Sequence, residues 1–507
     1  MRLIIGEYNK LKGKGKPRVL LVTPEITELP EGMGNIANYI RAKGGGMADI
    51  SAGLVDALFN NPEFEVHLTI PYYESNVQEL QSITESEILR LPRVLKEKAI
   101  HLVRDSAFTR LGVYDTDPIH SSISKSLAFQ RYIINVFLDE IQPDIVHCND
   151  WMTALVPAAA KQRGIKSLFT LHNVFTELAQ VRRINQEGIS ANQLKENLYF
   201  RGFPSDNLEE LWGNLVDFTA SGVFSSDAMN TVSKGFLEEI VTGEHQSIIP
   251  ASVRRVVQQK YEQGRAYGIL NAPNDKVHPD KSPHLKHKRN GKNMLEWKAH
   301  YKKEFQKATG LSQDLDSPLL FWPHRLYLQK GPELLCDLAL HFINKYHAQI
   351  GVVANGDQSI EKRLIELSNA NPNRIAFHSF NEALSEYGKA GADYMLMPSR
   401  YEPSGLPQME CPRYGTLPVV RLTGGLKDTV KELDIKKNTG NGFTFKAFTK
   451  EALARAVDRA IKNFYYQPEQ VKTQILQRIS DESIKTFSFA NTAKQYMEIY
   501  EQLFAER

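Results

Sequence analysis

Cysteine is scarce in this sequence: the 507 residues include three, Cys148, Cys336 and Cys411, far apart along the chain. An odd and dispersed set argues against both a disulfide framework and a zinc cluster. No run approaches the roughly 18 apolar residues that a membrane-spanning helix requires. Polar and basic residues follow Met1–Ile5, where a secretory signal would be apolar. We therefore expect a cytoplasmic protein with no membrane partner.

A strong net charge is also missing, since 62 basic and 59 acidic residues leave a formal charge of +3. That balance does not favour a nucleic-acid partner for the protein as a whole. One segment, 276–308, is locally basic, with ten Lys or Arg against three acidic residues. Trp297, Tyr301 and Phe305 recur there at helical spacing, so we interpret the segment as a solvated loop leading into an amphipathic helix.

Apolar runs of strand length alternate with helical patterns along the whole chain. The runs are Val19–Val22, Val66–Ile70, Ile145–His147, Ser167–Leu171, Gly351–Ala354, Ile375–His378, Tyr394–Met397 and Leu417–Val420. Short apolar strands between helices predict parallel sheets buried on both faces, which is an α/β fold. Ligands of such sheets gather at the carboxyl ends of the strands, and Lys43, Asp150, His172 and Glu402 each follow a predicted strand.

The chain is too long for one ordinary core, so two domains of about 200–250 residues each are expected. Turn-forming residues at Asn271–Asp275 place the boundary around Gly268–Pro279. A second strand–helix series then begins at Leu319. The apolar positions after Phe489 have helical spacing and predict a C-terminal helix.

The glycine loop Lys43-Gly44-Gly45-Gly46 lies between the strand Val19–Val22 and a helical pattern that begins at Ile50. It matches neither GxxxxGK[ST] nor GxGxxG, which excludes a P-loop and a dinucleotide fingerprint. A helix that starts at this loop leaves terminal amides unpaired, and Lys43 adds positive charge. We therefore expect an anion such as phosphate here, with a flexible linker as the alternative.

A second glycine cluster follows a carboxylate in the C-terminal half. Arg400-Tyr401-Glu402-Pro403-Ser404-Gly405-Leu406 precedes Thr423-Gly424-Gly425-Leu426. A carboxylate in a loop, followed by glycines that expose amides at a helix start, can hold a sugar hydroxyl and a pyrophosphate side by side. Plain strand–turn–helix punctuation is the alternative. Two such clusters in one chain favour a nucleotide-sugar site.

These clusters resemble the signatures of the bacterial glycogen synthases and plant starch synthases. Further matches occur in the order found in that family: His147-Cys148-Asn149-Asp150-Trp151, Thr170-Leu171-His172-Asn173, Thr231-Val232-Ser233, and Arg325 with Lys330. The resemblance covers nearly the whole chain and implies the GT-B arrangement, two Rossmann-like domains facing across a cleft. It implies an acceptor-side domain of residues 1–268, to which residues 483–507 cross back, and a nucleotide-sugar domain of residues 269–482.

The resemblance implies a retaining glucosyltransferase that moves glucose from ADP-glucose to the non-reducing end of an α-1,4-glucan. Arg325 and Lys330 would flank the donor pyrophosphate, with Lys43 closing over it, because electrostatic stabilisation is commonly the largest catalytic contribution. His172 would lie near the transferred glucose, and Glu402 would bind its hydroxyls. The implied phosphate-binding residues further include Gly45, Gly46, Gly405, Leu406, Thr423, Gly424 and Gly425.

Two positions keep alternatives. Asp150 either supports the sugar or the acceptor hydroxyl, or caps the helix that starts at Trp151. Phe380 either stacks on the nucleobase or belongs to the core. Because two cations and helix amides can meet the pyrophosphate charge, and no acidic pair with DxD spacing lies near the glycine loops, we expect no metal ion and no cofactor.

Several segments depart from the family pattern. The loop 23–42 is long, Ser404 replaces the usual Cys, and residues 270–273 depart from the usual Asn-Gly-Ile-Asp. Pro407 and Pro412 are expected to alter a helix start that donates to phosphate. These departures leave donor base and acceptor open, so UDP-glucose, a small acceptor, or an inactive glucan-binding relative are the alternatives. Retention of the cationic residues argues against the inactive relative.

Overall fold

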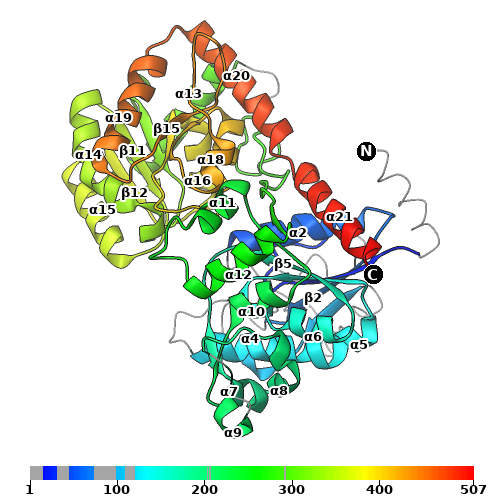
Figure 1. Cartoon of the computed structure of the whole chain (residues 1–507). Helices are drawn as coiled ribbons and strands as arrows, with labels where there is room; N and C mark the ends of the chain where they lie inside the picture. Colours follow the sequence, from blue (N-terminus) through cyan, green and yellow to red (C-terminus); the bar gives the residue numbers. More distant parts are fainter. Residues whose placement is uncertain are drawn as a thin grey trace, which may run out of the picture. The chain divides into compact units, whose positions relative to one another are not determined.

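The computed structural model describes residues 15–30, 33, 45–73, 99–108, 113, 120–202, 204, 207–289 and 293–507. The chain forms two compact units, the first containing Met1–Leu270 and Phe489–Arg507 and the second containing Asn271–Ser488 (Figure 1). The sequence placed these boundaries at 268/269 and 482/483. The second boundary lies later because α20 (Glu469–Thr486) packs against α13 (Met294–Thr309) and η8 (Cys411–Tyr414) of the second unit.

The described part of the first unit contains a seven-stranded parallel sheet in the order β3-β2-β1-β4-β5-β8-β9. Its strands are β1 (Arg18–Val22), β2 (Glu65–Pro71), β3 (Ile100–Val103), β4 (Ile145–Asn149), β5 (Lys166–Leu171), β8 (Ala228–Thr231) and β9 (Ala266–Gly268). An antiparallel pair, β6 (Leu178–Gln180) and β7 (Leu215–Asp217), stands apart from it.

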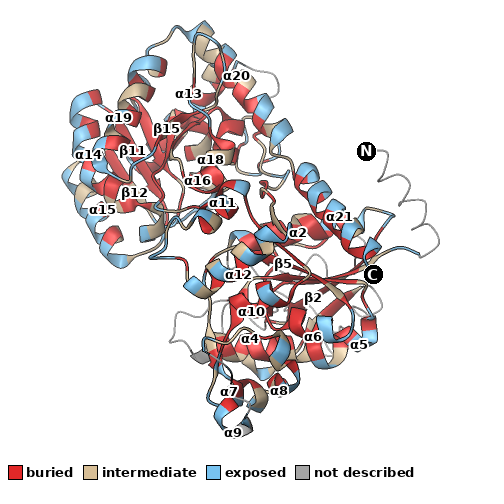
Figure 2. Cartoon of the chain, in the orientation of Figure 1, coloured by how far each residue is buried: buried red, intermediate tan, exposed pale blue. Residues whose placement is uncertain are grey.

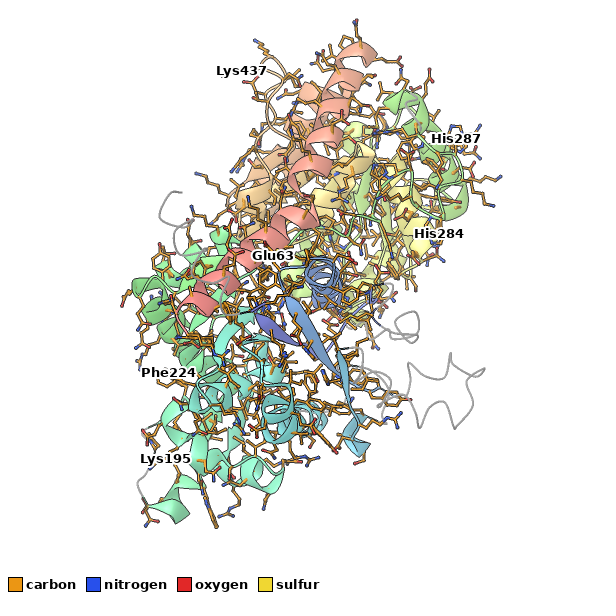
Figure 3. All side chains as sticks on the ribbon, turned by 90° about the vertical axis from the view of Figure 1, so that its right-hand side faces the viewer. Glu63, Lys195, Phe224, His284, His287 and Lys437 are labelled. Atoms are coloured by element: carbon orange, nitrogen blue, oxygen red, sulfur yellow. The ribbon has the colours of Figure 1, made fainter. Side chains whose placement is uncertain are left out.

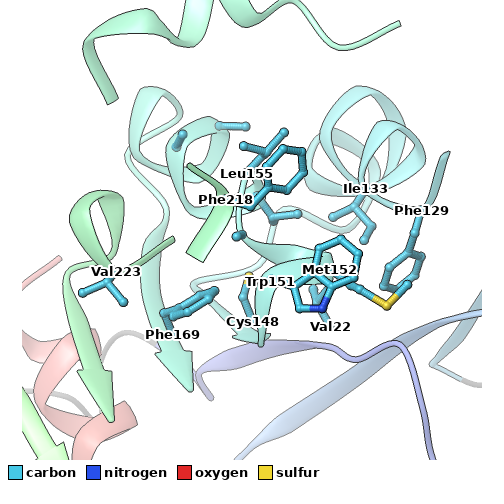
Figure 4. Close-up of a cluster of buried hydrophobic side chains, with 14 of the residues drawn as sticks. Val22, Phe129, Ile133, Cys148, Trp151, Met152, Leu155, Phe169, Phe218 and Val223 are labelled. Carbon is cyan, nitrogen blue, oxygen red and sulfur yellow. The ribbon is translucent and has the colours of Figure 1, made fainter. Parts of the chain in front are cut away.

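Helices cover this sheet, with buried inner faces and exposed outer faces (Figure 2). They are α2 (Gly46–Phe59), η3 (Ser106–Phe108), α4 (His120–Tyr132), η4 (Ile133–Phe137), α5 (Leu138–Ile141), η5 (Trp151–Thr153), α6 (Val156–Gln162), α7 (Val181–Gln186), α8 (Ala191–Leu194), η6 (Lys195–Asn197), α9 (Leu208–Leu211), α10 (Phe218–Ser225), α11 (Lys234–Thr242), α12 (Ala251–Glu262) and α21 (Phe489–Ala505). Apolar side chains fill one core, which includes Val22, Cys148, Trp151 and Phe169 (Figure 4).

The last helix, α21, belongs to the first unit, as predicted. It packs against α2, β4 and β5. Its buried Tyr500 hydroxyl lies 2.7 Å from His147 Nδ1, and the Asn230 side chain donates to the Tyr496 hydroxyl at 3.1 Å. Because these polar groups are buried, their hydrogen bonds fix the helix in one register on the sheet.

The described part of the second unit contains a six-stranded parallel sheet in the order β12-β11-β10-β13-β14-β15. Its strands are β10 (Leu319–Trp322), β11 (Gln349–Val353), β12 (Ile375–His378), β13 (Tyr394–Met397), β14 (Leu417–Arg421) and β15 (Phe443–Phe445). The remaining helices are η7 (Leu328–Lys330), α14 (Pro332–Tyr346), α15 (Gln358–Ala370), α16 (Glu382–Gly391), α17 (Pro407–Glu410), α18 (Gly425–Thr429), α19 (Lys450–Ala460) and η9 (Ile461–Tyr465). The predicted α/β class with parallel sheets is confirmed.

The basic segment is less solvated than predicted. Trp297 and Tyr301 are buried on α13, as expected from the spacing, but Lys298 and Lys302 are buried as well. Lys298 Nζ donates to the carbonyls of Ala390 and Ala392 at 3.0 and 2.6 Å and to the Thr416 hydroxyl at 2.8 Å. Buried lysines of α13 therefore hold this helix against other elements of the second unit. Charge counting missed this because it takes no account of which helix face a residue occupies.

Cys148, Cys336 and Cys411 are all buried and free. Among the described residues, a helix with the length and apolar character of a membrane span is not found.

Candidate functional site

In each parallel sheet the strand order reverses at one point, so that the chain moves toward one edge of the sheet on one side of this point and toward the other edge on the other side. The loops that leave the carboxyl ends of the two strands at this point diverge, and the crevice between them can bind a ligand. In the second unit this position lies between β10 and β13. The loop after β10 carries Arg325 and Lys330, and the loop after β13 carries Glu402. We call these two loops the second-unit edge. The sequence-predicted cations and carboxylate thus come from the two loops at this one position.

Lys330 and Glu402 are in direct contact. Lys330 Nζ lies 2.5 Å from Glu402 Oε2, which also accepts a hydrogen bond from the Ser399 hydroxyl at 3.1 Å. Glu402 is 4% exposed, whereas the Lys330 side chain is 21% exposed. A buried carboxylate without such partners would cost several kcal/mol. The pair is therefore a coupled unit, and a ligand that binds Lys330 must change the surroundings of Glu402.

The turn that holds Lys330 is fixed by the backbone. Gly331 has φ +74, and a Cβ there would lie 2.5 Å from the Pro398 carbonyl, so only glycine fits. The Arg400 amide donates to the Gln329 carbonyl at 2.8 Å, and the Gln329 side chain donates to the Tyr401 carbonyl at 3.3 Å. These contacts join the two loops and bring the backbone of Lys330 near that of Glu402.

The second glycine cluster packs on the same loop. The Gly425 amide donates to the Glu402 carbonyl at 3.0 Å, and a Cβ on Gly425 would lie 2.3 Å from the Ser404 carbonyl. Gly424 and Gly405 have positive φ angles of +45 and +75. The structure therefore brings Gly405, Leu406, Thr423, Gly424 and Gly425 to the second-unit edge. Glycine is needed at 425 because two backbone segments approach closely.

The two prolines near this loop do not prevent helix formation. Pro407 is the first residue of α17, and Pro412 lies in the first turn of η8. A proline is tolerated at such positions because the amide there has no partner within the helix. The helix that starts at Pro407 is therefore short: α17 ends at Glu410 and continues as the 3₁₀ helix η8.

Arg325, after β10, and Phe380, after β12, are both exposed. Phe380 is 58% exposed, and its amide donates to Asn355 Oδ1 at 2.8 Å. Its exposure excludes the alternative that Phe380 is a core residue. Burial lowers the pKa of His324, which precedes Arg325, to about 3 and keeps that imidazole neutral.

In the first unit the strand order reverses between β1 and β4. The candidate polar groups lie at the end of β4 and after β5, and we call Asn149, Asp150, His172 and Asn173 the first-unit edge. Asp150 Oδ1 accepts the backbone amides of His172 at 2.8 Å and Asn173 at 3.3 Å. Its side chain does not cap η5, so the capping alternative is wrong. Asp150 has φ 57 and ψ −178, a backbone conformation that costs about 1–3 kcal/mol outside glycine. The carboxylate thus shapes the loop after β5.

His172 is neutral at this edge. Burial lowers its pKa to about 3, and its Nε2 lies 2.9 Å from Asn149 Oδ1. Burial also raises the pKa of Asp150 from 3.8 to about 7, against the effect of the two amides and with a contribution from nearby Glu25. His147 differs from His172, because it is 1% exposed and bonded to Thr170 and Tyr500. It is a core residue.

Glu25 is a residue that the sequence reasoning missed. It is 1% exposed, and its Oε2 accepts the Gly45 amide at 2.7 Å at the start of α2. The prediction that this helix start leaves the Gly45 amide unpaired is therefore wrong in this structure, while Gly46 begins the helix as expected. The signal was available, because Thr23-Pro24-Glu25 follows the first strand directly. Lys43 lies outside the described residues.

One group of side chains among the described residues has the spacing of metal ligands. Glu239, Glu244 and His245 bring potential ligand atoms within 4.8 Å of one another at the end of α11. His245 Nε2 lies 3.5 Å from Glu239 Oε2. None of the predicted site residues belongs to it.

Residues 18–250 match the family model described as starch synthase catalytic domain, and residues 303–475 match glycosyl transferases group 1. A glycogen synthase of Syntrophotalea carbinolica is 31% identical over 490 residues, covering 90% of this chain and 96% of the relative. A glycogen synthase of Thermotoga maritima is 33% identical over 373 residues, covering 72% of this chain and 73% of the relative.

Among solved structures, the catalytic domain of starch synthase IV from Arabidopsis thaliana is similar in fold, with a TM-score of 0.74. The two sequences are 23% identical, and the match covers 97% of this chain and 100% of that chain. The Arabidopsis structure was solved with ADP and acarbose bound. Together, the family models and the full-length relatives show that this chain is a glycosyltransferase and belongs to the glycogen synthase and starch synthase family.

Proposed function

We propose that the protein is a retaining glucosyltransferase that transfers glucose from ADP-glucose to the non-reducing end of an α-1,4-glucan. The observation that carries the proposal is the Lys330–Glu402 pair, which puts a cation and a buried carboxylate 2.5 Å apart at one sheet edge. A nucleotide sugar needs both groups, because its diphosphate is anionic and its glucose offers hydroxyl donors.

The second-unit edge supports a defined role for each group. Breaking the anomeric C–O bond adds negative charge to the departing β-phosphate, and Lys330 and Arg325 are the cations proposed to meet it. Glu402 then accepts hydrogen bonds from glucose hydroxyls, exchanging part of its contact with Lys330 for the sugar. The glycine amides around 405 and 424–425 supply further proposed donors. The role proposed for Lys43 over the phosphates stays a prediction.

The first-unit edge suits an uncharged partner. His172 is neutral, so it can offer a hydrogen bond to a sugar hydroxyl without attracting phosphate. We place the glucan acceptor and the glucose being transferred near this edge. With a single buried carboxylate, Glu402, at the second-unit edge, we propose front-face substitution, in which the leaving phosphate helps to deprotonate the incoming 4-hydroxyl.

The choice of ADP over UDP is supported by the ADP bound to the Arabidopsis starch synthase. Exposed Phe380 supplies an aromatic face that we propose for the base. Aromatic stacking alone accepts either base, so a UDP-glucose donor or a small acceptor is the alternative. The expected cytoplasmic location stays a prediction.

A donor-by-acceptor screen tests the proposal. Purified full-length protein is incubated with ADP-glucose or UDP-glucose, each with glycogen, maltose or no acceptor, and the released nucleoside diphosphate is measured. We expect rapid ADP release that depends on glycogen. ADP should also raise the midpoint of thermal unfolding more than UDP at equal concentration, because a ligand bound only by the native state stabilises it. A preference for UDP-glucose or for maltose would replace the proposal with its alternative.

A further inference from the structure

One large apolar side chain at the first-unit edge points toward solvent. Phe175 follows His172 and Asn173 by a few residues and is 52% exposed. Its ring meets Trp151 in an edge-to-face arrangement, with centroids 5.8 Å apart and an interplanar angle of 65°. Trp151 is 6% exposed and lies in the core of the first unit (Figure 4). One part of the Phe175 ring is therefore anchored while much of it stays open.

The loop that carries Phe175 is held on both sides. The Val174 amide donates to Asn173 Oδ1 at 2.7 Å, and the Thr219 hydroxyl donates to the Phe175 carbonyl at 2.7 Å. The next residue, Thr176, donates its hydroxyl to Asp217 Oδ1 at 2.6 Å. An aromatic ring on such a fixed loop loses little conformational entropy when a ligand covers it. This rigidity favours a binding role.

The neighbours of Phe175 indicate the kind of ligand. His172 and Asn173 lie in the same loop as Phe175, and their amides both donate to Asp150, which precedes the Trp151 that Phe175 contacts. His172 is uncharged. A sugar ring has a face of C–H bonds and a rim of hydroxyls, which matches an aromatic ring beside hydrogen-bonding groups. A diphosphate requires cations, and residues 149–153 and 172–177, all of them described, include neither lysine nor arginine, which disfavours the donor diphosphate as the ligand.

We propose that Phe175 binds a glucose ring of the α-glucan acceptor and sets the affinity for that acceptor. The proposal rests on the proposed function, since it names the group that holds its acceptor. Phe175 acts here in binding and takes no part in the bond-breaking step. A glucan must cover the exposed face of the ring, while the anchored edge stays against Trp151.

Titration calorimetry of the full chain with maltoheptaose, without donor, tests this inference. Phe175→Ala should weaken binding about tenfold, the order expected for losing one aromatic contact face. Phe175→Tyr keeps the ring and should bind within about twofold of the wild type. In activity assays, KM for the glucan should rise with Phe175→Ala while KM for ADP-glucose and thermal protection by ADP stay unchanged.

Phe224→Ala is the matched control. Phe224 lies on α10 in the same unit, is 37% exposed and also packs edge-to-face, against Tyr199 at 6.3 Å (Figure 3). Its replacement removes a similar ring away from the first-unit edge and should leave maltoheptaose binding unchanged. Equal weakening in both variants would overturn the inference, as would a wild-type affinity in Phe175→Ala.

The two possible failures are distinguishable. A wild-type protein that transfers glucose to glycogen, with Phe175→Ala equally effective at low glucan concentration, overturns this inference alone. A wild-type protein that neither binds maltoheptaose nor transfers glucose overturns the proposed function and this inference together. A change in donor KM without a change in glucan affinity would assign Phe175 to the nucleotide instead, which also overturns the inference.

Discussion

The polar groups of both edges lie at the carboxyl ends of parallel strands, but their chemistry differs. At the second-unit edge a lysine and a glutamate form a close ion pair, Lys330 with Glu402, and Arg325, five residues before Lys330, is exposed. At the first-unit edge the pKa of His172 is lowered to about 3, so the imidazole is neutral, and Asp150 is held by backbone amides. The fold thus provides the position, and the loop residues decide what binds there.

Different partners explain why the two edges differ. Lys330 keeps 21% of its side chain exposed and contacts Glu402, so an incoming anion can exchange with that carboxylate. The surrounding protein disfavours the charged form of His172 and lowers its pKa to about 3. A diphosphate needs cations, whereas a glucan needs directional hydrogen bonds and an apolar face. We therefore expect a substitution at the second-unit edge to impair use of the nucleotide sugar, and a substitution at the first-unit edge to impair use of the glucan.

We expect the largest loss of activity for a substitution at the second-unit edge. Lys330→Ala should lower kcat/KM by about 10²–10³-fold, because it removes a cation from the departing phosphate, which corresponds to about 3–4 kcal/mol of barrier. Thermal protection by ADP should weaken with it, while glucan binding should not. Steady-state kinetics and thermal unfolding with and without ADP measure both effects.

The control for this variant is Lys345→Ala. Lys345 forms an exposed ion pair with Asp458 at 3.1 Å near the end of α14, away from the sheet edge. Such a pair contributes little to stability, so activity should stay within about twofold of the wild type. If Lys330→Ala behaved like Lys345→Ala, the assignment of the second-unit edge to the diphosphate would be wrong.

A substitution at the first-unit edge should lower activity less than Lys330→Ala does and should affect a different substrate. We expect His172→Ala to lower activity by about 10–10²-fold, or roughly 1.4–2.8 kcal/mol, through loss of hydrogen bonds to sugar. ADP protection should persist in this variant. Because the pKa of His172 is about 3, the activity of the wild type and the variant should have the same pH dependence between pH 5 and 8. A missing acid limb in the variant would contradict a neutral imidazole.

The strands that position both edges could be predicted from the sequence. The runs at Val19–Val22, Ile145–His147 and Tyr394–Met397 became β1, β4 and β13, because continuous apolar runs are what doubly covered parallel strands require. The short strands β3, β8, β9 and β15 and the antiparallel pair β6 and β7 were missed. Three or four residues at or near a sheet edge carry too little pattern to be distinguished from a loop.

The candidate site was predictable as a set of residues and only partly as geometry. Motif order brought Lys330 and Glu402 to attention, but their 2.5 Å contact depends on the backbone bonds between two loops that lie some 70 residues apart in sequence. The sequence shows that Glu25 directly follows the first strand, but its pairing with the amide of Gly45, a distant partner, leaves no local pattern. Burial of Lys298 was missed because a count of charges takes no account of the helix face that a residue occupies.

The smallest expected effect concerns the carboxylate of the first-unit edge. Burial raises the pKa of Asp150 from 3.8 to about 7, so the folded state binds this proton more tightly than the unfolded chain. Its contribution to stability is therefore fully present below about pH 4 and is lost as the pH rises to about 7. Asp150→Asn removes this titration, and Asn tolerates the positive φ of this position.

Urea unfolding at several pH values measures this difference between wild type and variant. Between pH 4 and 7 the wild type should lose stability relative to Asp150→Asn. Asp139→Asn gives the opposite control, since a hydrogen bond from Arg163 lowers the pKa of Asp139 and its contribution is lost as the pH falls toward and below 3.8. Parallel curves for the wild type and Asp150→Asn would mean that the two backbone amides keep Asp150 ionised. The first-unit edge would then carry a negative charge at neutral pH. Its ligand would have to donate hydrogen bonds to the Asp150 carboxylate, as the hydroxyls of a sugar can.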